Sequence, residues 1–169
     1  MVSAKKEPEE PATPNIIWTL VDDGRSNAEI IASIEAKGGR VSALAKAFSD
    51  EPVPPKGTKY PLVGIRGEEL PTGRERSILD IQAEADRRKY RKSPARVGLL
   101  LREKFISQEA LGYPCVVVFA DRSLLLVLGA EDELDEWNTP NDRLDVVSAH
   151  EELYWGSGSL FVFLAPSQT

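Results

Sequence analysis

The sequence predicts a mixed α/β fold, with about five strands in one sheet and helices packed on it. Two apolar runs, at 116–120 and 124–128, each have the length of a strand, and three polar residues separate them as in a hairpin. Neither run alternates between apolar and polar residues, so we expect both faces of these strands to be covered. In other segments, apolar residues recur at helical spacing, which predicts the helices that cover the sheet.

The chain length and the amino-acid composition favour one globular domain at 15–169, preceded by a flexible arm at 1–14. The chain has 169 residues, of which 41% are apolar and 28% are charged, as in ordinary soluble proteins. The arm contains three prolines and five charged residues, and too little apolar surface to fold alone. A net charge of −6 argues against a surface coated in nucleic acid but permits a local basic patch.

The number of cysteines and the lengths of the apolar runs indicate where in the cell the protein is expected. Cys115 is the only cysteine, which excludes a disulfide within the chain and a cysteine-based zinc site. Because it lies in an apolar run, we expect a buried, inert thiol. No segment approaches the ~18 apolar residues of a membrane span, and the charged, proline-rich N-terminus is unlike a signal peptide. We therefore expect a cytoplasmic protein that is not bound to a membrane.

The chain from residue 15 predicts a strand, a turn and a helix. Residues 15–22 form an apolar strand, and an Asp-Asp-Gly-Arg turn follows. Ser26 and Glu29 have the spacing of a capping box, in which each side chain satisfies a backbone amide of the first helical turn. The helix then places Ile30, Ile31 and Ile34 on one face, and Gly38-Gly39 ends it.

Part of this region resembles a known family. The elements are Val21-Asp22-Asp23, the isoleucine-rich helix and Gly39-x-Val41, which look like the opening β-α-β unit of response-regulator receiver domains. In that family the paired acids bind magnesium and a third aspartate ends the third strand. The third-strand candidate here, 61–67, has no aspartate. The resemblance therefore implies a degenerate receiver-like strand order without phosphotransfer.

The next segments predict a helix, a long loop and a second helix. Residues 41–48 place apolar side chains on a narrow helical stripe, with a strand as the alternative. Residues 50–74 are rich in proline and glycine, and only 62–65 could form a short strand. Residues 75–92 look helical and end in a basic cluster around one tyrosine: Arg87, Arg88, Lys89, Tyr90, Arg91 and Lys92. This cluster is either a solvated helix end or a phosphate-binding patch for nucleic acid.

The second half adds helices and a last strand. Ser93-Pro94 has the composition of a helix start, with Ser93 as the cap, and the helix runs to 105. Residues 144–154 could form another helix, and 160–164 the last strand. An acidic cluster before residue 144 suits a solvated helix start, a cation site or a surface for a basic partner. Its members are Glu131, Asp132, Glu133, Asp135 and Glu136.

The functional hypotheses come from these clusters, because the usual catalytic motifs are absent from the sequence. No G-x-S-x-G, P-loop or H-E-x-x-H pattern occurs. We therefore favour a non-catalytic binding or assembly module, without a cofactor, that docks into a protein or nucleoprotein complex through the charged patches and the arm, or that self-associates. One alternative is a nucleic-acid accessory protein that uses 87–92. The other is a magnesium-dependent nuclease or other hydrolase, in which Asp80 or Glu84 together with Asp121 could supply two of the carboxylates. A metal site at Asp22, Asp23 and Asp121 requires these three acids to converge at one edge of the sheet.

Overall fold

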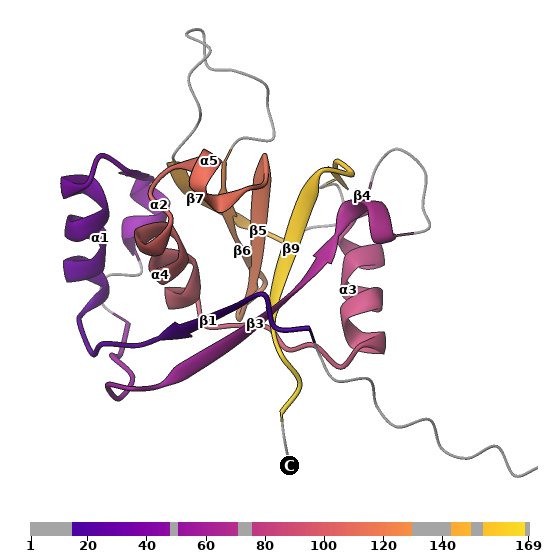
Figure 1. The fold of residues 1–169 in the computed structure, drawn as a ribbon, viewed down its shortest axis with the longest axis horizontal. Helices are drawn as coiled ribbons and strands as arrows, with labels where there is room; N and C mark the ends of the chain where they lie inside the picture. The colour runs from indigo at the N-terminus through magenta and orange to yellow at the C-terminus, as the bar shows by residue number, and fades with distance from the viewer. Residues whose placement is uncertain (1–14, 48–50, 71–75, 130–142, 150–153, 168–169) are drawn as a thin grey trace, which may run out of the picture.

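A computed structural model describes residues 15–47, 51–70, 76–129, 143–149 and 154–167, and confirms the mixed α/β class (Figure 1). Seven strands form one sheet in the order β1-β3-β9-β5-β6-β7-β2. The pairs β5–β9 and β2–β7 are parallel and the others are antiparallel. The strands are β1 (Trp18–Val21), β2 (Arg40–Val41), β3 (Lys59–Arg66), β5 (Cys115–Ala120), β6 (Leu124–Leu128), β7 (Arg143–Ser148) and β9 (Ser159–Leu164).

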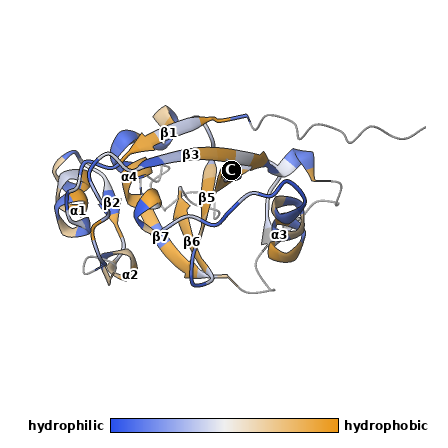
Figure 2. Cartoon of the chain, turned by 90° about the horizontal axis from the view of Figure 1, so that it is seen from below, coloured by the Kyte–Doolittle hydropathy of each residue, from blue (hydrophilic) through white to orange (hydrophobic). Residues whose placement is uncertain are grey.

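Helices cover both faces of this sheet, as the uniform apolar runs predicted. One face packs against α1 (Asn27–Ala36), α2 (Ala43–Lys46), α4 (Arg96–Lys104) and α5 (Gln108–Leu111). The other face packs against α3 (Ile78–Arg87) and the short pair β4 (Arg76–Ser77) and β8 (Tyr154–Trp155). Every residue of β5 and β9 is buried, and hydrophobic colour is concentrated on β5 and β6 in Figure 2.

Several local predictions are confirmed. β5 and β6 form an antiparallel hairpin, with Arg122 and Ser123 at positive φ in its turn. Ser26 Oγ accepts a hydrogen bond from the Glu29 amide at 3.2 Å, and Glu29 Oε2 accepts one from the Ser26 amide at 3.3 Å, which is the expected capping box. Cys115 is buried in the core beneath α3.

The predicted helix at 144–154 is wrong. Residues 143–148 form β7, and 154–155 belong to β8. Leu144 and Val146 are buried on one face of β7, opposite Leu128 and Leu126 of β6. The apolar residues of this segment fit a two-residue period as well as a helical one, and pairing with β6 decides between the two.

Other boundaries also differ from the predictions. β3 begins at Lys59, in the segment expected to be mainly loop, and contains Pro61. Proline fits there because β9 ends at Leu164, so Pro61 needs to supply only its carbonyl oxygen, which accepts from the Ala165 amide at 2.9 Å. Ser42 caps α2, and the preceding residue Val41 lies in β2, not in a helix.

The N-terminal boundary of α4 was also predicted incorrectly. Ser93 does not cap this helix; its amide donates to the Phe119 carbonyl, and residue 93 forms an isolated parallel bridge with Ala120. Ala95 is the N-cap residue and has no side-chain capping bond. Pro94 therefore lies in the link between a bridge to β5 and the start of α4, and the helix begins at Arg96, two residues later than expected.

The resemblance to receiver domains does not extend to strand order. Receiver-like folds place the first and second strands side by side in a parallel sheet. Here β1 pairs antiparallel with β3 at one edge of the sheet, and β2 pairs with β7 at the opposite edge. No helix in the part of the chain that the structure describes is both long and apolar enough to cross a membrane.

Candidate functional site

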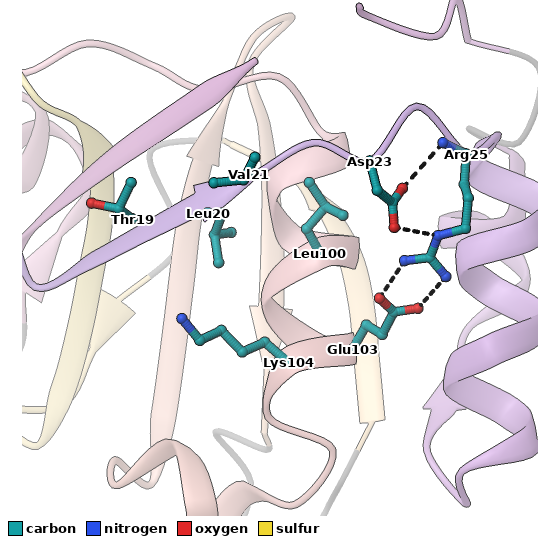
Figure 3. A pocket seen from close by; sticks show the side chains of 8 residues that line it. All are labelled: Thr19, Leu20, Val21, Asp23, Arg25, Leu100, Glu103 and Lys104. Atoms are coloured by element: carbon teal, nitrogen blue, oxygen red, sulfur yellow. Dashed lines mark hydrogen bonds and ion pairs between the residues drawn. The ribbon is translucent and has the colours of Figure 1, made fainter. Parts of the chain in front are cut away.

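The candidate site lies where the outer edge of β1 meets α4. α4 approaches the sheet closely at Gly98, where an added Cβ would lie 2.3 Å from Leu126 Cδ2 of β6. Close packing at this glycine positions the next turns of α4, including Leu100, Glu103 and Lys104, beside β1 (Figure 3). A pocket of about 160 Å³ opens between them. Its lining residues are Thr19, Leu20, Val21, Asp23, Arg25, Leu100, Glu103 and Lys104.

A buried ion pair fixes the C-terminal end of β1. Arg96 Nε lies 2.5 Å from Asp22 Oδ2, and Arg96 Nη2 donates to Asp22 Oδ1 at 2.8 Å; the two side chains are 3% and 0% exposed. Asp22 also accepts from the Tyr60 hydroxyl at 3.0 Å and from the Gly24 amide at 2.9 Å. Arg96 donates in addition to Asn27 Oδ1 and to the Arg25 carbonyl. The pair therefore ties β1, the start of α1 and α4 together.

These contacts shift two pKa values. Burial by itself would raise the pKa of Asp22, but the hydrogen bonds from Arg96, Gly24 and Tyr60 outweigh it and hold that pKa below its ordinary value. Burial, together with the hydrogen bond to the Asp22 carboxylate, raises the pKa of Tyr60 to about 12. Asp22 is therefore a charged structural anchor.

A second, more exposed ion network forms the wall of the pocket. Arg25 donates to both oxygens of Glu103, at 2.7 and 2.5 Å, and its Nε lies 2.6 Å from Asp23 Oδ2. The hydrogen bond from Arg25, followed by one from Ser33 and the charges of Arg25 and Lys37, lowers the pKa of Glu103 despite partial burial. The Glu103 carboxylate therefore faces α1 and the turn before it.

Lys104 extends in the other direction from Glu103, beneath Leu20 (Figure 3). Its ammonium lies 5.7 Å from the centre of the Phe105 ring. Among the residues that the structure describes, no carboxylate forms an ion pair with Lys104. Lys104 is therefore the one cation lining the pocket that makes no ion pair with a described carboxylate, since Arg25 pairs with both acids of the lining.

β1 is an edge strand, and its outer backbone groups point into the space beside the pocket. The Asp22 amide donates to the Thr58 carbonyl, so the pairs 22–58, 20–60 and 18–62 carry the hydrogen bonds to β3. Thr19 and Val21 alternate with these residues and direct their N–H and C=O groups away from β3. Pro61 lies opposite Thr19 and bonds toward β9, which agrees with this register.

The basic cluster predicted at 87–92 is divided between internal pairs and exposed charges. α3 ends at Arg87, so most of the cluster follows the helix, and Lys89 has a φ of 61°. Arg87 and Arg88 both pair with Glu84, at 2.5 and 2.7 Å. Tyr90 packs against Phe163, and Arg91 Nε donates to the Ala165 carbonyl. Lys89, Arg91 and Lys92 are exposed.

The pairing of Glu84 gives a direct test of that arrangement. The hydrogen bond from Arg87, followed by that from Arg88, lowers the pKa of Glu84 to about 2. We expect the Glu84 carboxyl carbon to titrate near this value by NMR, and to return toward the ordinary glutamate range in an Arg87→Ala/Arg88→Ala variant. Lys89→Ala is the matched control and should leave the titration unchanged. An ordinary midpoint in the wild type would contradict the pairing.

The acids proposed as metal ligands are not brought together. Within the described ranges, no group of three or more Asp, Glu, His or Cys side chains could hold a metal ion. Asp22 and Asp23 are engaged by Arg96 and Arg25, while Asp121 is exposed in the turn between β5 and β6. The acidic cluster Glu131, Asp132, Glu133, Asp135 and Glu136 lies outside the described residues, as does the arm at 1–14.

The sequence analysis did not identify Arg96, Arg102 or Lys104. A signal was present, because α4 contains two arginines six residues apart among apolar neighbours, in the segment RVGLLLREK. Buried arginines require partners, which makes such a pattern informative. Comparisons of the chain with protein-family models, curated protein sequences and solved structures give no match. The functional argument therefore rests on the residues and geometry above.

Proposed function

We propose that the protein is a non-catalytic binding module that docks a protein partner by adding one extended strand of that partner to the outer edge of β1. The observation that carries this proposal is the orientation of Thr19 and Val21, whose backbone groups point away from β3. An added strand gains affinity from main-chain hydrogen bonds and specificity from pockets for alternate side chains. The pocket between β1 and α4 lies where one such side chain would enter.

The side chains of β1 also favour docking. Edge strands are commonly protected by charge, proline or a covering segment. Thr19 and Val21 carry no charge, and Val21 is 55% exposed. At the opposite edge, β2 has only two residues, with α2 close by. A four-residue edge supports a short partner segment, so we expect modest affinity unless other surfaces contribute.

The charges around the edge support binding more than catalysis. Asp22 is paired with Arg96, and Arg25 is shared between Asp23 and Glu103. Groups held in this way order the rim of the pocket and have little freedom to exchange protons with a substrate. In this proposal, the arm at 1–14 and the clusters at 87–92 and 131–136 add electrostatic contacts to a larger assembly.

Peptide selection tests the proposal. The full chain is immobilised and presented with a random eight-residue displayed library, and enriched peptides are synthesised for titration. Thr19→Pro should weaken their binding by roughly tenfold or more, because it removes an outward N–H and places a ring where the added strand would lie. No hydrogen bond to β3 is lost, so circular dichroism and the melting temperature should change little.

Thr19→Val is the matched control, since it retains the N–H and the strand preference. Its affinity for the selected peptides should equal that of the wild type. Failure to enrich any peptide would overturn the proposal, as would peptides that bind Thr19→Pro and the wild type equally well.

A further inference from the structure

We infer that the partner strand carries an aspartate or glutamate opposite Leu20, and that Lys104 binds its carboxylate. This inference rests on the proposed docking at β1 and specifies the chemistry of the partner. It follows from the register of the edge, the position of Lys104 and the charges around the pocket.

The register determines which partner side chain enters the pocket. In an antiparallel addition, Thr19 and Val21 would form the hydrogen-bonded pairs, so Leu20 would lie in a non-hydrogen-bonded pair. Side chains of such a pair are close together and point to the same face of the sheet. Leu20 points to the face covered by α4, toward Leu100 and Lys104 (Figure 3). The partner residue opposite Leu20 therefore points toward the same two side chains.

The charge distribution selects an acid at that position. Arg25 is shared between Glu103 and Asp23, and the nearby charge of Lys37 also stabilises the Glu103 carboxylate. Lys104 has no ion pair within the described part of the chain. A carboxylate placed opposite Leu20 would gain the attraction of this exposed ammonium, beside the buried side chains of Leu20 and Leu100.

The same charge disfavours a second copy of the chain as the occupant. A twofold pairing of two β1 strands, with Thr19 bonded to Val21 of the other copy, places Leu20 opposite Leu20. Both Lys104 side chains would then lie near the symmetry axis on the same face, and like charges at close range repel. An acidic segment from a different protein avoids this repulsion.

The test repeats the peptide selection on Lys104→Glu beside the wild type. Wild-type selections should enrich Asp or Glu at one central position, with β-branched or polar neighbours. Lys104→Glu should enrich Lys or Arg at that position. For a wild-type peptide, changing its acid to alanine and changing Lys104 to alanine should each weaken binding by roughly two- to fivefold, as for an exposed ion pair, and the two changes together should cost little more than either one.

Lys59→Glu is the matched control, because Lys59 lies opposite Val21 and therefore on the other face of the sheet from Lys104. It should retain the acidic preference. If Thr19→Pro abolishes binding but Lys104→Glu leaves the preference unchanged, the inference fails and the proposed docking stands. If neither variant alters binding, both fail. A concentration-dependent dimer in sedimentation that Thr19→Pro dissociates would identify a second copy as the occupant and overturn the inference.

Discussion

Replacing Asp22 with alanine should lower the free energy of unfolding by roughly 3–5 kcal/mol, as expected when one member of a buried ion pair is removed. Arg96 would remain 3% exposed without the carboxylate that accepts two of its N–H groups. The Tyr60 hydroxyl would lose its acceptor in the same step. Urea denaturation at neutral pH measures the change, and retained far-ultraviolet circular dichroism would show that the variant still folds.

The effect of Asp22 should depend on pH in a defined direction. Its pKa is lower in the folded protein than its ordinary value, so the charged carboxylate stabilises the fold above the ordinary range. That contribution is lost as the pH falls through the lower, folded-state pKa. The difference in stability between the wild type and Asp22→Asn should therefore be largest near neutral pH and should shrink below about pH 4.

A double substitution separates pairing from simple burial. Replacing Asp22 with leucine and Arg96 with methionine removes both charges, and it should recover at least half of the stability lost in either single variant. The pKa of Tyr60, raised to about 12 by burial and Asp22, should fall in Asp22→Ala when followed by ultraviolet absorbance. A single-variant loss below about 1 kcal/mol, in the range of exposed ion pairs, would contradict the buried pair.

The central fold was predictable because its signals are local. The runs that form β5 and β6 are uniformly apolar and strand-length, and a three-residue polar turn joins them. The capping box at Ser26 and Glu29 needs only four consecutive residues. β7 was not predictable in the same way, because Leu144 fits a strand period with Val146 and a helical period with Val147, and pairing with β6 decides the outcome.

The candidate site was less predictable because it depends on contacts between distant residues. Asp22 was singled out as a metal ligand, but its guanidinium partner Arg96 is 74 residues away. No spacing rule connects two such positions. The position of β1 at the edge of the sheet depends on the order of the strands, which the sequence does not specify. By contrast, the pairing of Glu84 with Arg87 and Arg88 follows the helical spacing of three and four residues, so it could be predicted from the sequence. This pairing reduces the net positive charge of the basic cluster.

Replacing Arg102 with methionine should lower the free energy of unfolding by roughly 3 kcal/mol, the second large effect that we expect. Hydrogen bonds to a buried charged group are strong, and their loss leaves buried acceptors unsatisfied. Arg102 is fully buried in α4. It donates to the carbonyls of Phe105 and Ile106 at the end of its own helix, at 3.1 and 3.3 Å. It also reaches β7 through the Arg143 carbonyl at 3.3 Å.

Gln108 extends this network. Its Oε1 accepts from Arg102 at 2.7 Å, and its Nε2 donates to the carbonyls of Tyr113 and Leu128. Arg102 and Gln108 therefore join the end of α4, α5 and the end of β6. Arg102→Lys should recover little of the stability, because a lysine ammonium lacks the planar fork that reaches several carbonyls at once. Hydrogen exchange should become faster first at the amides of α5 and the ends of β6 and β7.

The control applies the same chemical change to an exposed arginine. Arg122 lies in the turn between β5 and β6 with a side chain that is 76% exposed, and Arg122→Met should change the free energy of unfolding by no more than about 0.5 kcal/mol. An equal loss in Arg102→Met and Arg122→Met would mean that the buried network contributes no more to stability than an exposed arginine does. A large loss in Arg102→Met alone, with faster exchange concentrated at α5 and the strand ends, would show that Arg102 anchors the C-terminal end of α4. Arg96 holds the start of α4 to β1, and Arg102 holds its end to β7 directly and to β6 through Gln108. These two anchors keep Lys104 beside β1.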